Sequence, residues 1–204
     1  MKTPDPTKTS LRQKADHAKT GRCKNLIIVL EAPHSIENIG TVIRNVNTLG
    51  AEKLYIVDRF NVLPPDWTHM RNKKKLMNVS ASAVKWTFVK KFTTTDECMD
   101  YLDSKGFISI VTSPHTKGKT NILLQNGDFT QGKLAVWFGN EARGISDIAV
   151  SRSAACVQIE MYGIIESLNL ATSTGIVLYE ITKQRREYQR THAHARKKNP
   201  PIKK

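Results

Sequence analysis

The sequence predicts an α/β protein in which a mostly parallel sheet carries helices on both faces. Short and almost continuously apolar runs have the length of strands that are buried on both sides, and they lie at residues 26–30, 54–57, 107–112 and 134–138. Segments with the apolar spacing of helices separate these runs. Because strands that alternate with helices are typical of parallel sheets, we expect one such sheet in the body of the chain.

The clearest predicted helix follows the first strand. Apolar residues recur at positions 39, 42, 43, 46 and 49, which is helical spacing, and Gly50 is expected to end the helix. Asn38 is expected both to cap this helix and to take part in function. The other predicted elements are a helix at residues 10–19, a loop at 61–75, a strand at 84–88, a helix at 95–104 capped by Thr95 or Asp96, a strand at 156–159 and a helix at 167–188.

The positive charge is concentrated at the two ends of the chain. Residues 1–25 hold seven basic and two acidic residues, and residues 183–204 hold nine basic residues and one acidic residue. Residues 26–182 are almost balanced, with sixteen basic against fifteen acidic residues. Two basic arms favour a polyanionic partner, because each Lys or Arg bound to a phosphate releases counterions. For residues 196–204, a tail that is only solvated is an equally good interpretation.

The composition excludes several classes of protein. No apolar run approaches the roughly 18 residues that a membrane span needs, and no apolar stretch of a secretory signal follows Lys2 and Lys8. The three cysteines are an odd number and are widely spaced, which excludes a disulfide scaffold and gives no zinc-ligand spacing. We therefore expect no metal site, and a reducing, cytoplasmic compartment is favoured.

The loops that follow the strands are the places to look for a site, since ligands of parallel sheets collect beyond the carboxyl ends of the strands. These loops carry no G-x-G-x-x-G dinucleotide motif and no P-loop lysine motif. They also lack the G-x-S-x-G nucleophile elbow. A dinucleotide-binding fold and a P-loop ATPase are therefore not indicated.

Three other motifs do lie at predicted strand ends. The first is N-I-G-T-V-I-R-N at residues 38–45, which opens the helix after the first strand. The second is W-F-G-N-E-A-R-G-I at residues 137–145. The third joins I-E-M-Y-G at residues 159–163 to E-S-L-N-L-A at residues 166–171. In this order, the set resembles the three motifs of the SpoU/TrmH family of RNA ribose 2′-O-methyltransferases, within the SPOUT superfamily.

The resemblance runs across about residues 26–188 and implies a fold, a cofactor and an activity. Residues 134–178 would be tied in a deep trefoil knot that forms the site for S-adenosyl-L-methionine, and the enzyme would act as a homodimer. The implied organisation is a basic N-terminal extension at residues 1–25, a methyltransferase domain at residues 26–188 and a basic C-terminal tail at residues 189–204. The implied reaction transfers a methyl group to the 2′-hydroxyl of a ribose in RNA.

By motif position, the resemblance also assigns roles to single residues. Arg44 would be essential, either in removing the hydroxyl proton or in holding the substrate phosphate and stabilising an alkoxide, because guanidinium is a poor base. Asn38, Ser167 and Asn169 would position Arg44 and the substrate, unless Ser167 simply caps the last helix. Glu141 would fix the knotted loop or the dimer, or take a direct part in catalysis. The residues expected around the cofactor are Thr112, Gly139, Gly144, Ile159, Met161 and Leu168.

Contacts to RNA are expected from both arms and from the basic cluster at residues 71–75. The residues concerned are Arg12, Lys14, Arg22, Lys73, Lys74, Arg185 and Arg186. His34 either touches RNA or is an ordinary exposed loop residue. Among family members, the short basic extensions favour a tRNA substrate, particularly guanosine 18 of the D-loop. The alternatives are the wobble nucleotide of the anticodon loop, ribosomal RNA, and a catalytically silent RNA-binding protein. The chain departs from the family pattern at Glu160, where proline is usual.

Overall fold

The computed structural model describes residues 9–64, 69, 72–130 and 132–198. Within these residues, seven strands form one sheet in the order β3-β2-β1-β6-β4-β7-β5. All pairings between neighbouring strands are parallel, as the sequence predicts. The strands are β1 (Cys23–Glu31), β2 (Ala51–Val57), β3 (Phe88–Phe92), β4 (Ile108–Thr112), β5 (Asn121–Leu123), β6 (Leu134–Phe138) and β7 (Ala155–Gln158).

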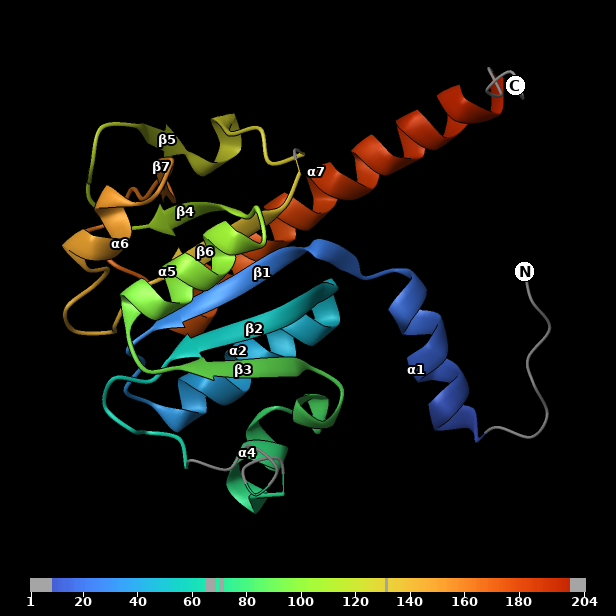
Figure 1. Cartoon of the computed structure of the whole chain (residues 1–204), viewed down its shortest axis with the longest axis horizontal. Helices are drawn as coiled ribbons and strands as arrows, with labels where there is room; N and C mark the ends of the chain where they lie inside the picture. Colours follow the sequence, from blue (N-terminus) through green and yellow to red (C-terminus); the bar gives the residue numbers. More distant parts are fainter. Residues whose placement is uncertain (1–8, 65–68, 70–71, 131, 199–204) are drawn as a thin grey trace.

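Helices cover both faces of the sheet (Figure 1). On one face α2 packs against α7 and α4, and on the other face lie α5 and α6. Figure 1 shows α1 standing to one side of the sheet, while the C-terminal part of α7 projects away from it. The helices are α1 (Ser10–Thr20), α2 (Ile36–Leu49), α4 (Lys74–Val79), α5 (Thr95–Ser104), α6 (Asp147–Ser151) and α7 (Leu170–Lys198), with short 3-10 turns at Ala83–Lys85 and Leu124–Asn126.

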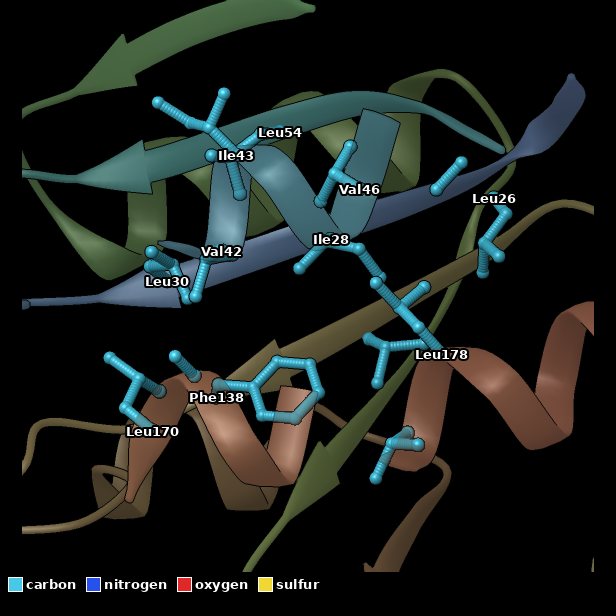
Figure 2. Close-up of a cluster of buried hydrophobic side chains, with 14 of the residues drawn as sticks. Leu26, Ile28, Leu30, Val42, Ile43, Val46, Leu54, Phe138, Leu170 and Leu178 are labelled. Atoms are coloured by element: carbon cyan, nitrogen blue, oxygen red, sulfur yellow. The ribbon is translucent and has the colours of Figure 1, made fainter. Parts of the chain in front are cut away.

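The central strand β1 supplies side chains to two separate cores. Leu26, Ile28 and Leu30 pack on one face against residues of α2 and α7, with Phe138 of β6 beside them (Figure 2). On the other face, alternate residues of the same strand pack against α5 and α6. Since side chains alternate across a strand, a strand buried on both faces is apolar at every position. This explains why residues 26–30 form a continuous apolar run.

Local signals set the ends of α2. The Ser35 hydroxyl accepts a hydrogen bond from the backbone N–H of Asn38, so Ser35 is the N-cap, and the expectation that Asn38 caps the helix is wrong. The helix begins at Ile36, which leaves the Asn38 side chain free for another role. Gly50 ends the helix with a φ of +85°, a left-handed conformation that glycine adopts without strain.

Several predicted boundaries are shifted. The strand expected at residues 84–88 is wrong, because Ala83–Lys85 form a 3-10 turn and the strand starts only at Phe88. The last helix begins at Leu170, and it continues through the predicted boundary at residue 188 to Lys198. Thr94 rather than Thr95 or Asp96 caps α5. Among the helices of the described residues, none is long and apolar enough to cross a membrane.

Candidate active site

The loops at the carboxyl ends of β4, β6 and β7 enclose a cavity of about 420 Å³. All six residues predicted to surround a cofactor line it: Thr112, Gly139, Gly144, Ile159, Met161 and Leu168. Ser167 and Glu141 also line the cavity. The chain therefore brings its second and third motifs together, although the residues concerned lie on separate loops.

Residues outside the three motifs complete the lining. The segment after β4 contributes Ser113, Pro114, His115 and Lys117, none of which was singled out from the sequence. Loops that follow strands are the expected place for a site, but no local sequence pattern indicates that residues 113–117 turn toward the cavity. Apolar surface comes from Phe138, Val157 and Leu170, so the cavity offers both apolar contact and polar groups.

The shape of the cavity depends on Gly139. A Cβ atom at this position would lie 2.2 Å from the backbone carbon of Gly144 and 2.2 Å from the backbone nitrogen of Ile145. Such distances are shorter than any non-bonded contact, and backbone atoms cannot swing away as a side chain can. Glycine at 139 therefore allows the loop to fold back tightly on itself beside the cavity.

Asn140 holds the same loop closed. Its backbone N–H and C=O exchange hydrogen bonds with Gly144, each with an N···O distance of 2.9 Å. Its side-chain oxygen accepts from the N–H groups of Ala142 and Arg143, at 2.9 Å each, and its side-chain nitrogen donates to the carbonyl of Ala32 at 2.6 Å. The asparagine thus fixes the loop and ties it to the end of β1, a role that the sequence analysis missed.

The Glu141 carboxylate joins the loop after β6 to the loop after β1. Its two oxygens accept hydrogen bonds from the backbone N–H of His34 at 2.9 Å, from the backbone N–H of Ser35 at 3.2 Å and from the side-chain nitrogen of Asn38 at 2.9 Å. These donors come from the loop and helix that carry the first motif. Fixing the loop is one of the three roles expected for Glu141.

The three donors keep this carboxylate ionised. Partial desolvation acts to raise the pKa of Glu141, but the hydrogen bonds from Asn38, His34 and Ser35 stabilise the charged form and outweigh it. The pKa of Glu141 therefore lies below its usual value. Hydrogen bonds to an ionised acceptor are about twice as strong as neutral ones. The contact between the two loops is therefore strongest while the Glu141 carboxylate is charged.

Asn38 and Asn169 extend the contact to the third motif. The side-chain nitrogen of Asn169 donates to the side-chain oxygen of Asn38 at 3.1 Å. Because the carboxylate of Glu141 can only accept, the amide of Asn38 must turn its nitrogen to Glu141 and its oxygen to Asn169. A single line of hydrogen bonds therefore joins one residue from each motif.

Asn169 also begins the last helix. Its side-chain oxygen accepts from the backbone N–H groups of Ala171 at 2.8 Å and Thr172 at 3.3 Å, which makes it the N-cap of α7. Ser167 lies before the helix and does not cap it, contrary to the alternative considered from the sequence. The side chain of Asn45 in α2 donates to the carbonyl of Ala171 at 2.8 Å and locks the two helices together here.

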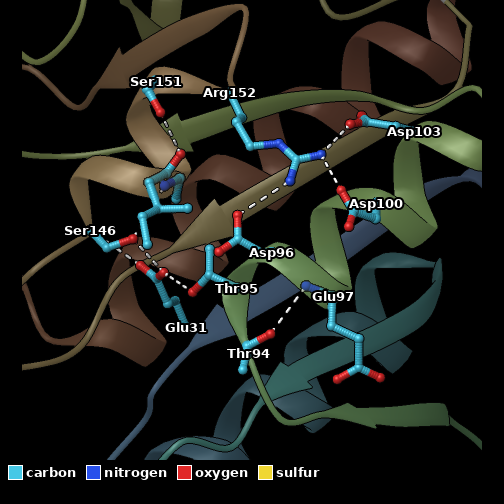
Figure 3. A network of polar contacts seen from close by, with 12 residues as sticks. Glu31, Thr94, Thr95, Asp96, Glu97, Asp100, Asp103, Ser146, Ser151 and Arg152 are labelled. Carbon is cyan, nitrogen blue, oxygen red and sulfur yellow. Dashed lines mark hydrogen bonds and ion pairs between the residues drawn. The ribbon is translucent and has the colours of Figure 1, made fainter.

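A second carboxylate fixes the far end of the loop at residues 139–145. Glu31, buried at the end of β1, accepts hydrogen bonds from the N–H and hydroxyl of Ser146, at 2.8 and 2.6 Å, and from the hydroxyl of Thr95 at 2.5 Å (Figure 3). Ser146 is the N-cap of α6 and follows the loop at residues 139–145 directly. Both ends of that loop are therefore fixed to β1.

Arg44 lies apart from this network. It is on α2, its side chain is exposed, and within the described part of the chain it makes no hydrogen bond or ion pair. Its guanidinium is thus available to a ligand in solvent. The structure of this chain alone does not bring Arg44 into contact with Asn38, Ser167 or Asn169, which were expected to position it.

The basic residues expected to bind RNA differ in their exposure. Arg12, Lys73, Lys74 and Arg186 are exposed. Arg185 is only 5% exposed, and its guanidinium donates to the carbonyls of Phe129 and Asn25, so its assignment as an RNA contact is wrong.

Arg22 also serves the fold, because it is half-buried and donates to the carbonyl of Trp86 at 2.8 Å. Its contact with RNA stays a prediction. The side chain of Lys14 lies outside the described part of the structure. The exposed residues among these expected RNA contacts therefore lie on α1, at the start of α4 and on α7.

Known proteins with similar sequences include RNA methyltransferases. The chain is 27% identical to the tRNA (guanosine(18)-2′-O)-methyltransferase of Aquifex aeolicus over 168 residues, which cover 81% of this chain and 72% of that protein. It is 26% identical to the 23S rRNA (guanosine-2′-O-)-methyltransferase of Coxiella burnetii over 160 residues, which cover 78% of this chain and 59% of that protein.

Solved structures share the fold. The TrmH/SpoU tRNA modifying enzyme of A. aeolicus superposes with a TM-score of 0.72 and 23% identity, covering 89% of this chain and 87% of that one. The SpoU methyltransferase AviRb of Streptomyces viridochromogenes, in complex with AdoMet, superposes with a TM-score of 0.67 and 23% identity, covering 81% of this chain and 62% of that one.

The close approach of backbone atoms to Gly139 allows a direct test of whether this loop shapes the cavity. We expect Gly139→Ala to weaken binding of S-adenosylmethionine about tenfold or more, since overpacking of a tight site costs about 1–3 kcal/mol. Isothermal titration calorimetry measures the affinity. Gly163→Ala is the matched control, because a Cβ at Gly163 meets nothing closer than 4.0 Å. Equal affinity in both variants would show that the tight loop does not shape the site.

The match to a family model agrees with the site geometry. The SpoU rRNA Methylase family model aligns with residues 25–179, which is well over half of the chain and contains all three motifs. The same residues hold the cavity and the hydrogen-bonded line from Asn38 to Asn169. This chain belongs to the SpoU rRNA methylase family.

Proposed function

We propose that this chain transfers a methyl group from S-adenosylmethionine to the 2′-hydroxyl of a ribose in tRNA, with guanosine 18 of the D-loop as the favoured target. The observation that carries the proposal is the cavity at the carboxyl ends of β4, β6 and β7, with one residue from each family motif hydrogen-bonded beside it. Family membership supports the reaction, and several relatives named for guanosine 18 of tRNA support the target.

The cavity suits the proposed cofactor in size and chemistry. Its volume of about 420 Å³ lies in the usual range of roughly 300–1,000 Å³ for small-molecule pockets. We assign the edge of the adenine to backbone N–H and C=O groups of Gly139 and Ile159, which line the cavity, while Phe138 and Leu170 offer apolar contact. When bound, the cofactor supplies an electrophilic methyl group on a sulfonium.

The role we assign to Arg44 follows from its chemistry and exposure. The attacking hydroxyl must lose its proton. A guanidinium cannot easily accept that proton, because it is itself protonated at neutral pH. It does bind phosphate through paired N–H groups and stabilises negative charge on oxygen. We therefore assign Arg44 to the phosphate of the target nucleotide and to the oxygen as charge develops on it, with Asn38, Asn169 and Ser167 lining the path to the cofactor.

The arms are proposed to bind RNA. α1 and the projecting end of α7 carry exposed basic residues on elements that lie beyond the sheet, as Figure 1 shows. Such residues supply affinity that does not depend on sequence, through contacts with phosphates. We propose a cytoplasmic location for the reaction, which fits the three free cysteines.

Two further features belong to the proposal. The first is the trefoil knot across residues 134–178, which rests on membership of the family. The second is a homodimer. The segment after β7 and the adjoining face of α7 expose an apolar patch made of Tyr162, Ile164, Ile165, Leu168, Ile176 and Tyr179.

A second copy of the chain is the proposed occupant of this patch. Ile164 is 98% exposed, and a groove between the segment after β7 and α7 is lined by Tyr162, Ile176 and Tyr179. Contiguous apolar surface of this kind marks an interface, and two copies related by a two-fold axis would cover each other's patch. Because Leu168 also lines the cofactor cavity, such a dimer would close the cavity from solvent.

A charged side chain placed at the centre of the proposed interface tests the dimer. We expect the wild-type chain to sediment as a dimer at micromolar concentration and Ile164→Glu to sediment as a monomer, since a carboxylate would be buried without a partner. Ile108→Glu serves as the control, because Ile108 is exposed at the start of β4, away from the patch. A monomeric wild type, or a dimeric Ile164→Glu, would contradict the proposal.

Methyl transfer tests the function itself. Unmodified tRNA is incubated with the enzyme and radiolabelled S-adenosylmethionine, then digested to nucleosides. We expect labelled 2′-O-methylguanosine from the D-loop in the wild type. We expect Arg44→Ala to lower kcat about 100-fold or more, the size of effect seen when a group that acts on the transition state is lost. Its affinity for the cofactor should stay unchanged, because Arg44 does not line the cavity.

The outcomes separate the alternatives. Label in ribosomal RNA or at the anticodon wobble nucleotide, but not in the D-loop, would show that the same reaction acts on a different target nucleotide. Cofactor binding with no transfer to any of these RNAs would reject the target class. Neither transfer nor cofactor binding would leave the catalytically silent RNA-binding protein. A near-normal kcat in Arg44→Ala would remove Arg44 from the chemistry.

A further inference from the structure

Phe60 presents an aromatic ring at the edge of the sheet that carries the cavity. It lies in the turn that directly follows β2, and it is 37% exposed. A phenylalanine in this position leaves apolar surface in water at the same edge as the loops of the three motifs. Large apolar side chains that stay exposed beside a binding site are common points of ligand contact.

The turn that carries Phe60 is rigidly built. The buried carboxylate of Asp58 accepts hydrogen bonds from the backbone N–H groups of Val62 at 2.8 Å and Leu63 at 3.0 Å, and it forms an ion pair with Lys91 at 2.8 Å. Asn61, next to Phe60, has a φ of +51° and bonds back to the Asp58 carbonyl. The ring therefore stands on a preformed platform, which lowers the entropy that a ligand contact would cost.

Two polar side chains from other loops contact the ring. His34, after β1, lies edge-on to Phe60 with 4.8 Å between ring centroids. The guanidinium of Arg143, after β6, lies over the ring at 5.6 Å from its centroid. Both residues are exposed. A planar cation, an imidazole and a benzene ring thus meet at one place, although they come from three separate loops.

The loops that carry this cluster follow β2, β1 and β6, which are consecutive in the sheet. The cofactor cavity lies over the end of β6 as well, and over the ends of β4 and β7, the next two strands in the sheet. Arg143 belongs to both places, because it also lines the cavity. The Asn38–Glu141 pair lies between them, since Glu141 lines the cavity and also binds the N–H of His34.

We propose that Phe60, His34 and Arg143 form the subsite for the base of the target nucleotide, and that the base is a guanine. This proposal rests on the proposed function and adds the place where the target base is held. A base on the cluster and a cofactor in the cavity would put the intervening ribose beside Asn38. This is the arrangement that transfer to a 2′-hydroxyl requires.

The chemistry of the three side chains fits a guanine. Bases in RNA loops are recognised after they leave their stack, by lying against aromatic rings or guanidinium planes. The guanidinium of Arg143 can also donate two hydrogen bonds to the O6 and N7 atoms of guanine, a pairing that uracil and cytosine cannot offer. The ring nitrogens of His34 add a further donor or acceptor.

The experiment uses tRNA transcripts with 2-aminopurine, a fluorescent purine, in place of guanosine 18, together with S-adenosylhomocysteine so that no transfer occurs. Stacking on the protein quenches the fluorescence of this base. We expect the full-length wild type to quench it, Phe60→Leu to lose the quenching and Phe60→Tyr to retain it, because only tyrosine keeps an aromatic face. Phe88→Leu is the matched control, since Phe88 is 54% exposed and has the Lys53 ammonium 5.9 Å from its ring centroid, but starts β3 at the opposite edge.

Methyl transfer to unmodified tRNA is measured on the same variants. We expect Phe60→Leu to raise the KM for tRNA about tenfold, within the range for loss of one base-stacking contact, and to leave cofactor affinity unchanged. Quenching by wild type and Phe60→Leu alike, or by neither, would overturn the subsite even where transfer to tRNA is normal. Quenching that depends on Phe60 without any transfer to tRNA would support the subsite and reject the proposed function.

Discussion

The Glu141 carboxylate is the constraint on which the site depends. It accepts hydrogen bonds from two backbone N–H groups in the loop after β1 and from the Asn38 side chain, while its own loop forms a wall of the cavity. Neighbouring parallel strands bring these loops to one edge of the sheet but do not fix their conformations. The carboxylate fixes them to each other, and the amide of Asn38 passes the connection on to Asn169 and α7.

The Glu141 carboxylate can hold the two loops together because other groups already restrict their conformations. Gly139 lets its loop fold back without a clash, Asn140 closes that loop, and Glu31 holds its far end through Ser146. Asn140 and Glu31 also satisfy backbone polar atoms that a loop would otherwise leave to water. The cavity is therefore shaped by hydrogen bonds between loops, whereas the two apolar cores on either side of β1 hold the strands in register.

The sequence is a good guide to what local periodicity determines. Residues 26–30 and 134–138 are predicted as strands because a strand buried on both faces must be apolar throughout, and the structure confirms them as β1 and β6. The six predicted cofactor residues all line one cavity, because the motifs sit at strand ends that the parallel sheet brings together.

Long-range contacts are what the sequence could not supply. Arg185 belongs by charge to the C-terminal arm, but it turns inward to carbonyls near residues 25 and 129. Asn38 has the usual features of an N-cap, yet Ser35 takes that position and Asn38 faces Glu141, 103 residues away in the chain. The meeting of Phe60 with His34 and Arg143 is likewise set by strand order and by the turn at Asp58, and no local pattern marks it.

The most direct test of this account is the titration of the Glu141 side-chain carboxyl by NMR, in the wild type and in Asn38→Ala. A carboxylate that accepts three hydrogen bonds must titrate below the usual glutamate pKa of about 4.3. Loss of the Asn38 donor must raise that pKa. Because the pKa of Glu141 is lowered in the folded state, its hydrogen bonds add stability at pH values above the ordinary glutamate pKa. This stability is lost as the pH falls through the lowered pKa. A wild-type pKa at or above the usual value, or no change in Asn38→Ala, would contradict the central role of this carboxylate.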